Sequence, residues 1–137
     1  MGFCLYNNVA VGAAHARAHG AAKSRIVDYD VHHGNGTQHM FRSRSARALS
    51  SRHTSTRIYP GPARPTRSDA EPGAGFTVNL PIEAGAVDED FDSASSEVVV
   101  PVLRQFEPEL VMVSAGFDAH ERRPAGGMRL TPGSSRR

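Results

Sequence analysis

Residues 26–37 read IVDYDVHHGNGT, so a short apolar start of strand type runs directly into two carboxylates and two imidazoles. Side chains two positions apart on an extended backbone leave on the same face, so Asp28, Asp30 and His32 are expected to project together. The run Gly34-Asn35-Gly36 predicts a sharp turn with a close backbone approach. Carboxylates beside histidines at a strand end are typical of a metal site, although polar residues also gather there simply because a loop begins.

The donor types indicate which metal such a site would hold. One imidazole with carboxylate oxygens and no thiolate suits Zn²⁺, with Fe²⁺, Co²⁺ or Mn²⁺ as physically possible substitutes. A catalytic zinc has three protein ligands and an open fourth position, so one more ligand is expected from elsewhere in the chain. Asp118 is the candidate, because the apolar run 110–113 is followed by a small-residue turn and then this acid. Open α/β sheets place their sites at such strand ends.

Strands and helices are expected to alternate along the chain. The predicted strands cover residues 24–28, 46–53, 76–80 and 110–114, and the predicted helices cover residues 9–19, 37–41 and 89–106. Asn7 or Asn8 is expected to cap the first helix and Asp88 the last, which Pro101 should kink. This order predicts an α/β fold, with a mainly parallel sheet flanked by helices and no internal domain boundary.

Three separated segments carry specific motifs: Gly2–Asn8, Asp28–Thr37 and Ser114–His120. Together, and in this order, they resemble the zinc-dependent histone deacetylase family, in its bacterial and class-II-like branch. Tyr59–Gly61 and Gly126–Thr131 are also similar to family segments. The resemblance implies an arginase/deacetylase-like α/β fold, incomplete in this chain, and zinc-dependent hydrolysis of N-acetyl amides. The substrate would be an acetylated lysine peptide or an acetylpolyamine.

The resemblance also implies roles for individual residues. Three of them match the zinc ligands of the family: Asp30, His32 and Asp118. Asp28 and Asn35 fall at supporting positions just outside the ligands. Five residues fall at positions of a possible structural potassium site: Asp28, Asp30, His32, Ser51 and Arg52. Three residues fall on the wall of the substrate channel: Gly2, Phe3 and Tyr59.

The catalytic partners of the family are not matched in these 137 residues. In the family, a pair of adjacent histidines serves as general base and a tyrosine stabilises the oxyanion, whereas His32-His33 belongs to the metal motif here. We therefore expect residues 1–131 to be the central part of a deacetylase catalytic domain and residues 132–137 to be a non-homologous tail. Such a chain should bind metal weakly and have little or no deacetylase activity.

Two other functions are compatible with the motifs. One is a non-catalytic protein that binds metal or acyl-lysine. The other is a binuclear-metal ureohydrolase, which shares the general fold but would need further aspartates to hold two Mn²⁺ ions. The number of metal ions bound per chain would distinguish a ureohydrolase, which binds two, from a deacetylase, which binds one.

Composition narrows the partners and the location. The chain has 16 basic and 14 acidic residues, and its bases gather at 42–67 and 122–137 without a nucleic-acid motif, so nucleic-acid binding is not expected. No apolar run approaches the ~18 residues of a membrane span. Cys4 is the only cysteine, which excludes an internal disulfide and favours the cytoplasm, and we expect its thiol to be buried. His15 and His19 should lie on one solvated helix face.

Overall fold

The computed structural model describes residues 4–42, 50–54, 77–123 and 127–132, and side chains are described for all of these except 42 and 50–54. The strands are β1 (Ser24–Asp28), β2 (Ser50–Thr54), β3 (Thr77–Pro81) and β4 (Leu110–Ser114). The helices are α1 (Asn8–Ala18), α2 (Asn35–Arg42), α3 (Asp88–Ala94), the π-helical η1 (Ser95–Val99) and α4 (Val100–Phe106). The predicted α/β class is confirmed.

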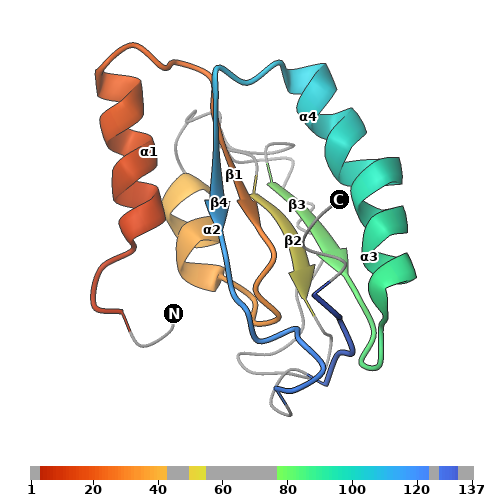
Figure 1. The fold of residues 1–137 in the computed structure, drawn as a ribbon. Helices are drawn as coiled ribbons and strands as arrows, with labels where there is room; N and C mark the ends of the chain where they lie inside the picture. The colour runs from red at the N-terminus through yellow and green to blue at the C-terminus, as the bar shows by residue number, and fades with distance from the viewer. Residues whose placement is uncertain (1–3, 43–49, 55–76, 124–126, 133–137) are drawn as a thin grey trace.

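The described strands form one parallel sheet in the order β3-β2-β1-β4. In Figure 1, α1 and α2 lie on one side of this sheet, and α3 and α4 lie on the other. Asp28 is in register with Ser114, so β1 and β4 end together, whereas β2 pairs with Asp28 through Arg52 and continues to Thr54. The loops that follow β1 and β4 are therefore neighbours, although they are far apart in the sequence.

Two strands have the bounds that the sequence predicts, β1 and β4, because each contains β-branched apolar residues and is bounded by turn residues. The strand expected at 46–53 is found at Ser50–Thr54, and the strand expected at 76–80 at Thr77–Pro81. Pro81 is the last residue of β3, which lies at the edge of the described sheet. A proline is tolerated there because no further strand needs its missing N–H.

Helix α1 is capped as predicted. Asn7 accepts a hydrogen bond from the Ala10 N–H at 3.0 Å through its side-chain oxygen, and its amide donates to the Thr37 hydroxyl at 2.9 Å. The second bond joins α1 to α2. Ala10 and Ala13 face the sheet and pack with Ile26 and Phe41 in a first core cluster. Small side chains on α1 let the helix approach β1 closely.

The helix predicted at 89–106 corresponds to α3, η1 and α4 together, and it begins at Asp88. Asp88 is thus its first residue, and the expectation that it serves as the cap is wrong. Val87 occupies the cap position, and its N–H donates to the Asp90 carboxylate at 2.9 Å. Pro101 was expected to kink this helix, and the structure places η1 immediately before it. Because Pro101 has no N–H and its ring crowds the carbonyl four residues back, the preceding turn widens to a π-helix.

A second core cluster lies at the carboxyl edge of the sheet, and we call it the site core. Its buried members are Val31, Ala86, Phe91, Ala119, Met128 and Leu130, with Ile82 packed against them. These residues come from three loops and from α3. The site core therefore joins the segments that follow β1, β3 and β4.

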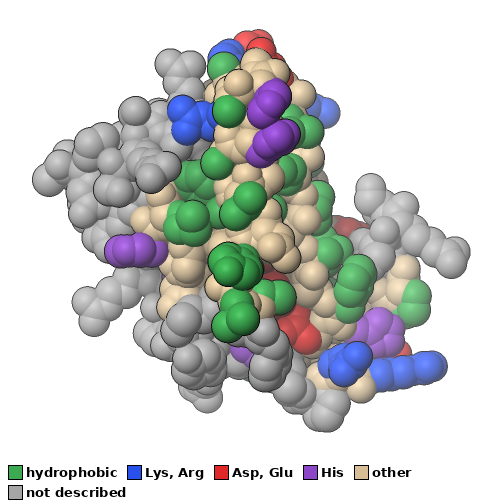
Figure 2. All heavy atoms as spheres, turned by 90° about the vertical axis from the view of Figure 1, so that its left-hand side faces the viewer, with side chains coloured by type: hydrophobic (Ala, Val, Ile, Leu, Met, Phe, Trp, Pro, Cys, Tyr) green, Lys and Arg blue, Asp and Glu red, His purple; other side chains and the backbone are tan. Residues whose placement is uncertain are grey.

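The amino-terminal residues and α1 present apolar side chains to solvent. Figure 2 shows hydrophobic side chains on this face of the molecule. The exposed large apolar residues of these segments are Leu5, Tyr6 and Val11, and Met40 is exposed on α2. Cys4 is also exposed, so the expectation of a buried thiol is wrong. It lies before the helix in a segment that does not pack on the core, as the 98% exposure of Leu5 shows. No helix in the described ranges is long and apolar enough to cross a membrane.

Candidate metal centre

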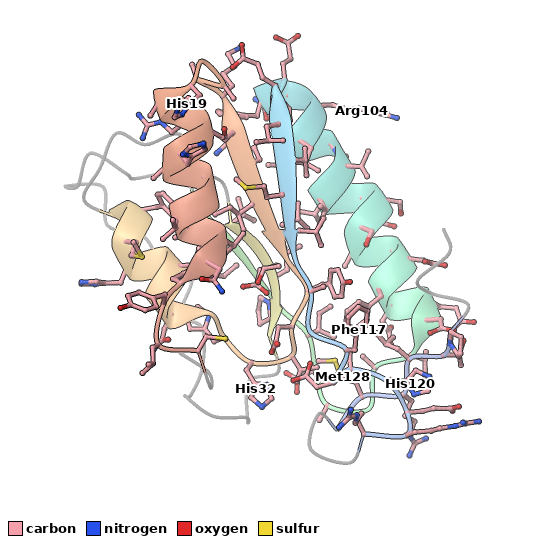
Figure 3. All side chains as sticks on the ribbon, turned by 60° about the vertical axis from the view of Figure 1, so that its left-hand side comes forward. His19, His32, Arg104, Phe117, His120 and Met128 are labelled. Carbon is pink, nitrogen blue, oxygen red and sulfur yellow. The ribbon has the colours of Figure 1, made fainter. Side chains whose placement is uncertain are left out.

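Three side chains meet at the carboxyl edge of the sheet. Asp30, His32 and Asp118 each offer one ligand atom, and these atoms lie within 4.8 Å of one another. His32 Nδ1 is 3.1 Å from Asp30 Oδ1 and 2.6 Å from Asp118 Oδ2. Among the residues whose side chains are described, no other group of three histidine, cysteine or acidic residues comes together in this way. In Figure 3, His32 lies at the opposite end of the molecule from His19 and Arg104.

The loop after β1 is shaped by its own acidic side chains. The Asp30 N–H donates to Asp28 Oδ1 at 3.2 Å, and the His32 N–H donates to Asp30 Oδ1 at 2.7 Å. Such bonds from a side chain to the backbone two residues on compete with strand pairing, so β1 ends at Asp28. The alternation expected of an extended strand is therefore replaced by two successive turns. Asp28 is buried, and within this loop its Oδ1 holds the Asp30 N–H.

Asp118 joins this loop from β4. Its Oδ1 accepts a hydrogen bond from the Val31 N–H at 3.3 Å, while its Oδ2 faces His32 Nδ1. Val31 is fully buried in the site core. One carboxylate thus binds the backbone of the other loop and also points an oxygen at its histidine. These two contacts fix the orientation of the Asp118 carboxylate.

Gly116 is part of the site, and sequence reasoning did not single it out. A Cβ at this position would lie 2.7 Å from Asp30 Cβ and would overlap the Asp30 carboxyl group. The loop after β4 therefore passes directly against a cluster residue. The only signal in the sequence is the small-residue pair Ala115-Gly116 ahead of Asp118.

The remaining predicted site residues lie in different surroundings. The Asn35 N–H donates to the His33 carbonyl at 2.7 Å, which closes a tight turn at Gly34 as expected, and Asn35 is also the first residue of α2, which the sequence predicts to begin at Thr37. Ser51 and Arg52 belong to β2, and their side chains are outside the described part. The residues predicted to line the substrate channel, namely Gly2, Phe3 and Tyr59, also lie outside the described residues.

Histidines outside the cluster have other partners. His15 on α1 and His19, the residue that ends this helix, are both exposed with stacked rings 4.0 Å apart, which confirms the prediction of a solvated face. His120 Nδ1 accepts a hydrogen bond from the Arg122 N–H at 3.1 Å, so it serves within its own loop.

A cavity of about 470 Å³ lies beside the cluster on the α3 side of the sheet. Its apolar wall includes Val27, Phe91 and Val99, and Phe117 stands over it in edge contact with Tyr29 at a ring distance of 6.4 Å. Asp30, His32 and Asp118 do not line it, whereas Gly116 and Ala119 do. Gly116, which lies against Asp30, thus also lines this cavity.

The donor set fits a zinc ion. It consists of two carboxylates and one imidazole, so it carries excess negative charge that favours a cation. The side chains of Asp30, His32 and Asp118 are 34%, 36% and 25% exposed. A metal held by them would have protein on one side and solvent on the other, as a catalytic site with an open ligand position requires.

Comparison with known proteins was made for the whole chain. The family model described as histone deacetylase domain matches residues 1–137. Histone deacetylase 15 of Arabidopsis thaliana is 44% identical over 135 residues, which cover 96% of this chain and 24% of the relative. Polyamine deacetylase HDAC10 of Homo sapiens is 42% identical over 138 residues, which cover 96% of this chain and 20% of the relative.

A solved structure is also similar to this chain. The crystal structure of the HDA15 HD domain superposes with a TM-score of 0.90 and 41% identity, covering 98% of this chain and 39% of that one. The chain thus spans 24% and 20% of the length of the two curated relatives described above.

Proposed function

This chain belongs to the histone deacetylase family, and from that premise we propose that Asp30, His32 and Asp118 bind a zinc ion used to hydrolyse N-acetyl amides. The observation that carries the proposal is the meeting of three donor side chains from two distant loops within 4.8 Å. If these acids were near one another only by chance, Asp118 would not be expected to accept a hydrogen bond from the Val31 N–H of the other loop, as it does.

The ion would supply Lewis acidity toward an amide carbonyl. The residues of the chain would hold and orient it. Asp30 is fixed by its bond to the His32 N–H and by its contact with Gly116, and Asp118 is fixed by the Val31 N–H. The site core beneath them excludes water from the protein side, which strengthens electrostatic interactions at the cluster. Rigid support of this kind is what a metal centre needs to keep its ligands in place.

The proposed substrates are acetylated lysine peptides or acetylpolyamines, because the relatives include a histone deacetylase and a protein named polyamine deacetylase. We further propose that the 137-residue polypeptide turns over such substrates slowly by itself. The sequence contains one pair of adjacent histidines, His32-His33, and His32 is already assigned to the metal. A proton acceptor separate from the ligands is needed for efficient amide hydrolysis.

A potassium ion beneath the zinc is the second cation we propose. Asp28 is 4% exposed and is the register partner of Arg52 on β2, and both are positions of the potassium site that the family resemblance implies. Oxygen donors such as the Asp28 carboxylate suit a hard monovalent cation.

The cytoplasmic location favoured by the single cysteine stays a prediction.

Neither alternative function is favoured. Within the described residues the cluster offers three ligand side chains, whereas a binuclear ureohydrolase needs more. A non-catalytic reader of acyl-lysine would use the same cluster, so it differs from the proposal only in turnover.

Zinc titration of the metal-free 137-residue chain, followed by calorimetry, tests the ligand assignment. We expect about one zinc per chain, as a three-residue site dictates, and loss of this binding in His32→Ala. The matched control is His39→Ala, which removes an exposed histidine on α2 and should bind zinc normally. Equal binding by wild type and His32→Ala would overturn the assignment.

Acetate release from an acetyl-lysine peptide and from an acetylpolyamine, with zinc present, tests the catalytic part. We expect turnover that is slow but faster than with zinc and no protein, because a proton acceptor separate from the ligands is lacking. Turnover no faster than with zinc alone would favour the reader alternative. Rapid turnover that a hydroxamate chelator abolishes would contradict the proposed low activity and would exclude the reader alternative.

A further inference from the structure

Asp88 and Thr131 make a two-point contact across 43 residues of sequence. The Thr131 N–H donates to Asp88 Oδ1 at 2.9 Å, and the Thr131 hydroxyl donates to Asp88 Oδ2 at 2.5 Å. Both groups are part-buried, so the contact is shielded from competing water. Hydrogen bonds to a carboxylate are the stronger kind, and two in parallel also fix direction. The chain at Thr131 is thus held against the first turn of α3.

Asp88 is available for this contact because another acid serves the start of the helix. The Val87 N–H donates to Asp90, whereas both Asp88 oxygens accept from Thr131. An acid at the first position of a helix is favoured by the helix dipole in any case. Its two hydrogen bonds to a distant segment are not explained by that preference.

The segment held by Asp88 runs beside the loop that carries Asp118. The Leu130 N–H donates to the Ala119 carbonyl at 3.2 Å, and the Glu121 N–H donates to the Leu130 carbonyl at 2.9 Å. On the other side, the Arg129 N–H donates to the Ala86 carbonyl at 2.9 Å. Residues 129–131 therefore lie between the loop before α3 and the loop after β4, and they are bonded to both.

Ala119 connects this framework to the metal centre. It follows Asp118 directly, is 4% exposed, and packs with Leu130 and Val31 in the site core. Figure 3 shows Met128, another member of the site core, at the same end of the sheet as His32. Because the core is close-packed, a shift of Leu130 would move Ala119 and with it the Asp118 carboxylate.

We infer that Asp88 and Thr131 are positioning residues for the metal centre, acting on Asp118 through Leu130 and Ala119. They do not belong to the cluster of ligand atoms. The inference rests on the proposed zinc binding. It predicts that loss of the Thr131 hydroxyl weakens metal binding, although this hydroxyl is not one of the metal ligands.

Cobalt(II) titration of the metal-free 137-residue chain, read by visible absorbance, tests this inference. We expect Thr131→Val to lower cobalt affinity by about tenfold, the lower end of what supporting partners of a metal site provide, and to alter the absorption bands. Thr131→Ser keeps the hydroxyl and should restore both affinity and spectrum. The matched control is Ser24→Ala, which removes a hydroxyl that donates to the Ala21 carbonyl at 2.8 Å at the opposite end of β1.

The results separate the inference from the proposed function. Absence of any cobalt signal in the wild type would overturn the zinc assignment itself. A wild-type signal with equal affinity in Thr131→Val would leave that assignment in place and overturn the positioning role. If circular dichroism shows that Thr131→Val does not fold, Asp88→Asn decides, because it keeps the side-chain shape and one acceptor oxygen. Weaker cobalt binding in Asp88→Asn supports the role, and unchanged binding overturns it.

Discussion

Gly116 packs against Asp30 so closely that no side chain can be added at position 116 without displacing the Asp30 carboxyl group. Asp30 belongs to the loop after β1 and Gly116 to the loop after β4, so the contact joins the two loops that carry the proposed metal ligands. Residue 116 must therefore be glycine for Asp30 to keep this position.

Gly116→Ala should weaken zinc binding by about 10- to 100-fold, the range seen when the support of a metal ligand is lost. Asp30 must move to make room for the new methyl group. Its carboxylate oxygen is then no longer close to the ligand atoms of His32 and Asp118. Competition with a zinc-sensitive dye measures the affinity. The control is Gly12→Ala, whose new methyl group would meet Met112 Sδ at an ordinary 3.5 Å. Equal affinity in both variants would show that the Gly116 contact does not matter.

Zinc should stabilise the folded chain. A ligand present at 100 times its dissociation constant adds about 2.7 kcal/mol to the free energy of unfolding when it binds only the folded state. Asp118→Asn should abolish most of this gain, since a neutral amide is a weaker metal ligand than a carboxylate. Thermal unfolding with and without zinc gives the measurement, and Glu97→Gln, an exposed change on η1, is the control. An undiminished gain in Asp118→Asn would remove Asp118 from the ligand set.

Ile26→Val should reduce the free energy of unfolding by about 0.5–1.5 kcal/mol, as for other losses of one buried methylene group. Ile26 is 1% exposed and packs with Ala10, Ala13 and Phe41 on the α1 side of the sheet. Because that cluster is separate from the site core, zinc affinity of the folded chain should stay unchanged. Urea unfolding and zinc titration of the same sample check both halves, and a large loss of affinity would contradict this separation.

Asn7→Ala should destabilise the chain by about 1 kcal/mol, the typical value for a lost helix cap. It removes the bond to the Ala10 N–H and also the bond to the Thr37 hydroxyl, which is buried. Asn7→Asp retains a capping carboxylate and should lose less stability. Urea unfolding of both variants measures the contribution of the cap. Identical losses would mean that the cap contributes nothing.

The sheet and the donor residues could be read from local patterns. Apolar runs flanked by turn residues located β1 and β4, and an acid soon after each run placed candidate ligands at one edge, because parallel strands end on the same side. The order of strands across the sheet was not available from such patterns. It depends on packing between segments that are far apart in the sequence.

Contacts between distant residues also explain what sequence reasoning missed. The need for glycine at 116 depends on Asp30, and the role of Asp88 depends on Thr131. Cys4 was expected to be buried because apolar residues flank it, yet nothing in the described structure covers that segment. The turns after Asp28 were missed because side chains there bond the backbone two residues on, which a strand pattern does not reveal.

The central claim is that Asp118 joins Asp30 and His32 around one metal ion. The most direct measurement is a crystal structure of the zinc-soaked chain with an anomalous difference map at the zinc edge. We predict one peak among these three side chains, about 2.0–2.2 Å from the His32 nitrogen and the two carboxylate oxygens. A zinc peak at His15 and His19 or at Cys4, with the three side chains remaining in mutual hydrogen bonds, would contradict the account.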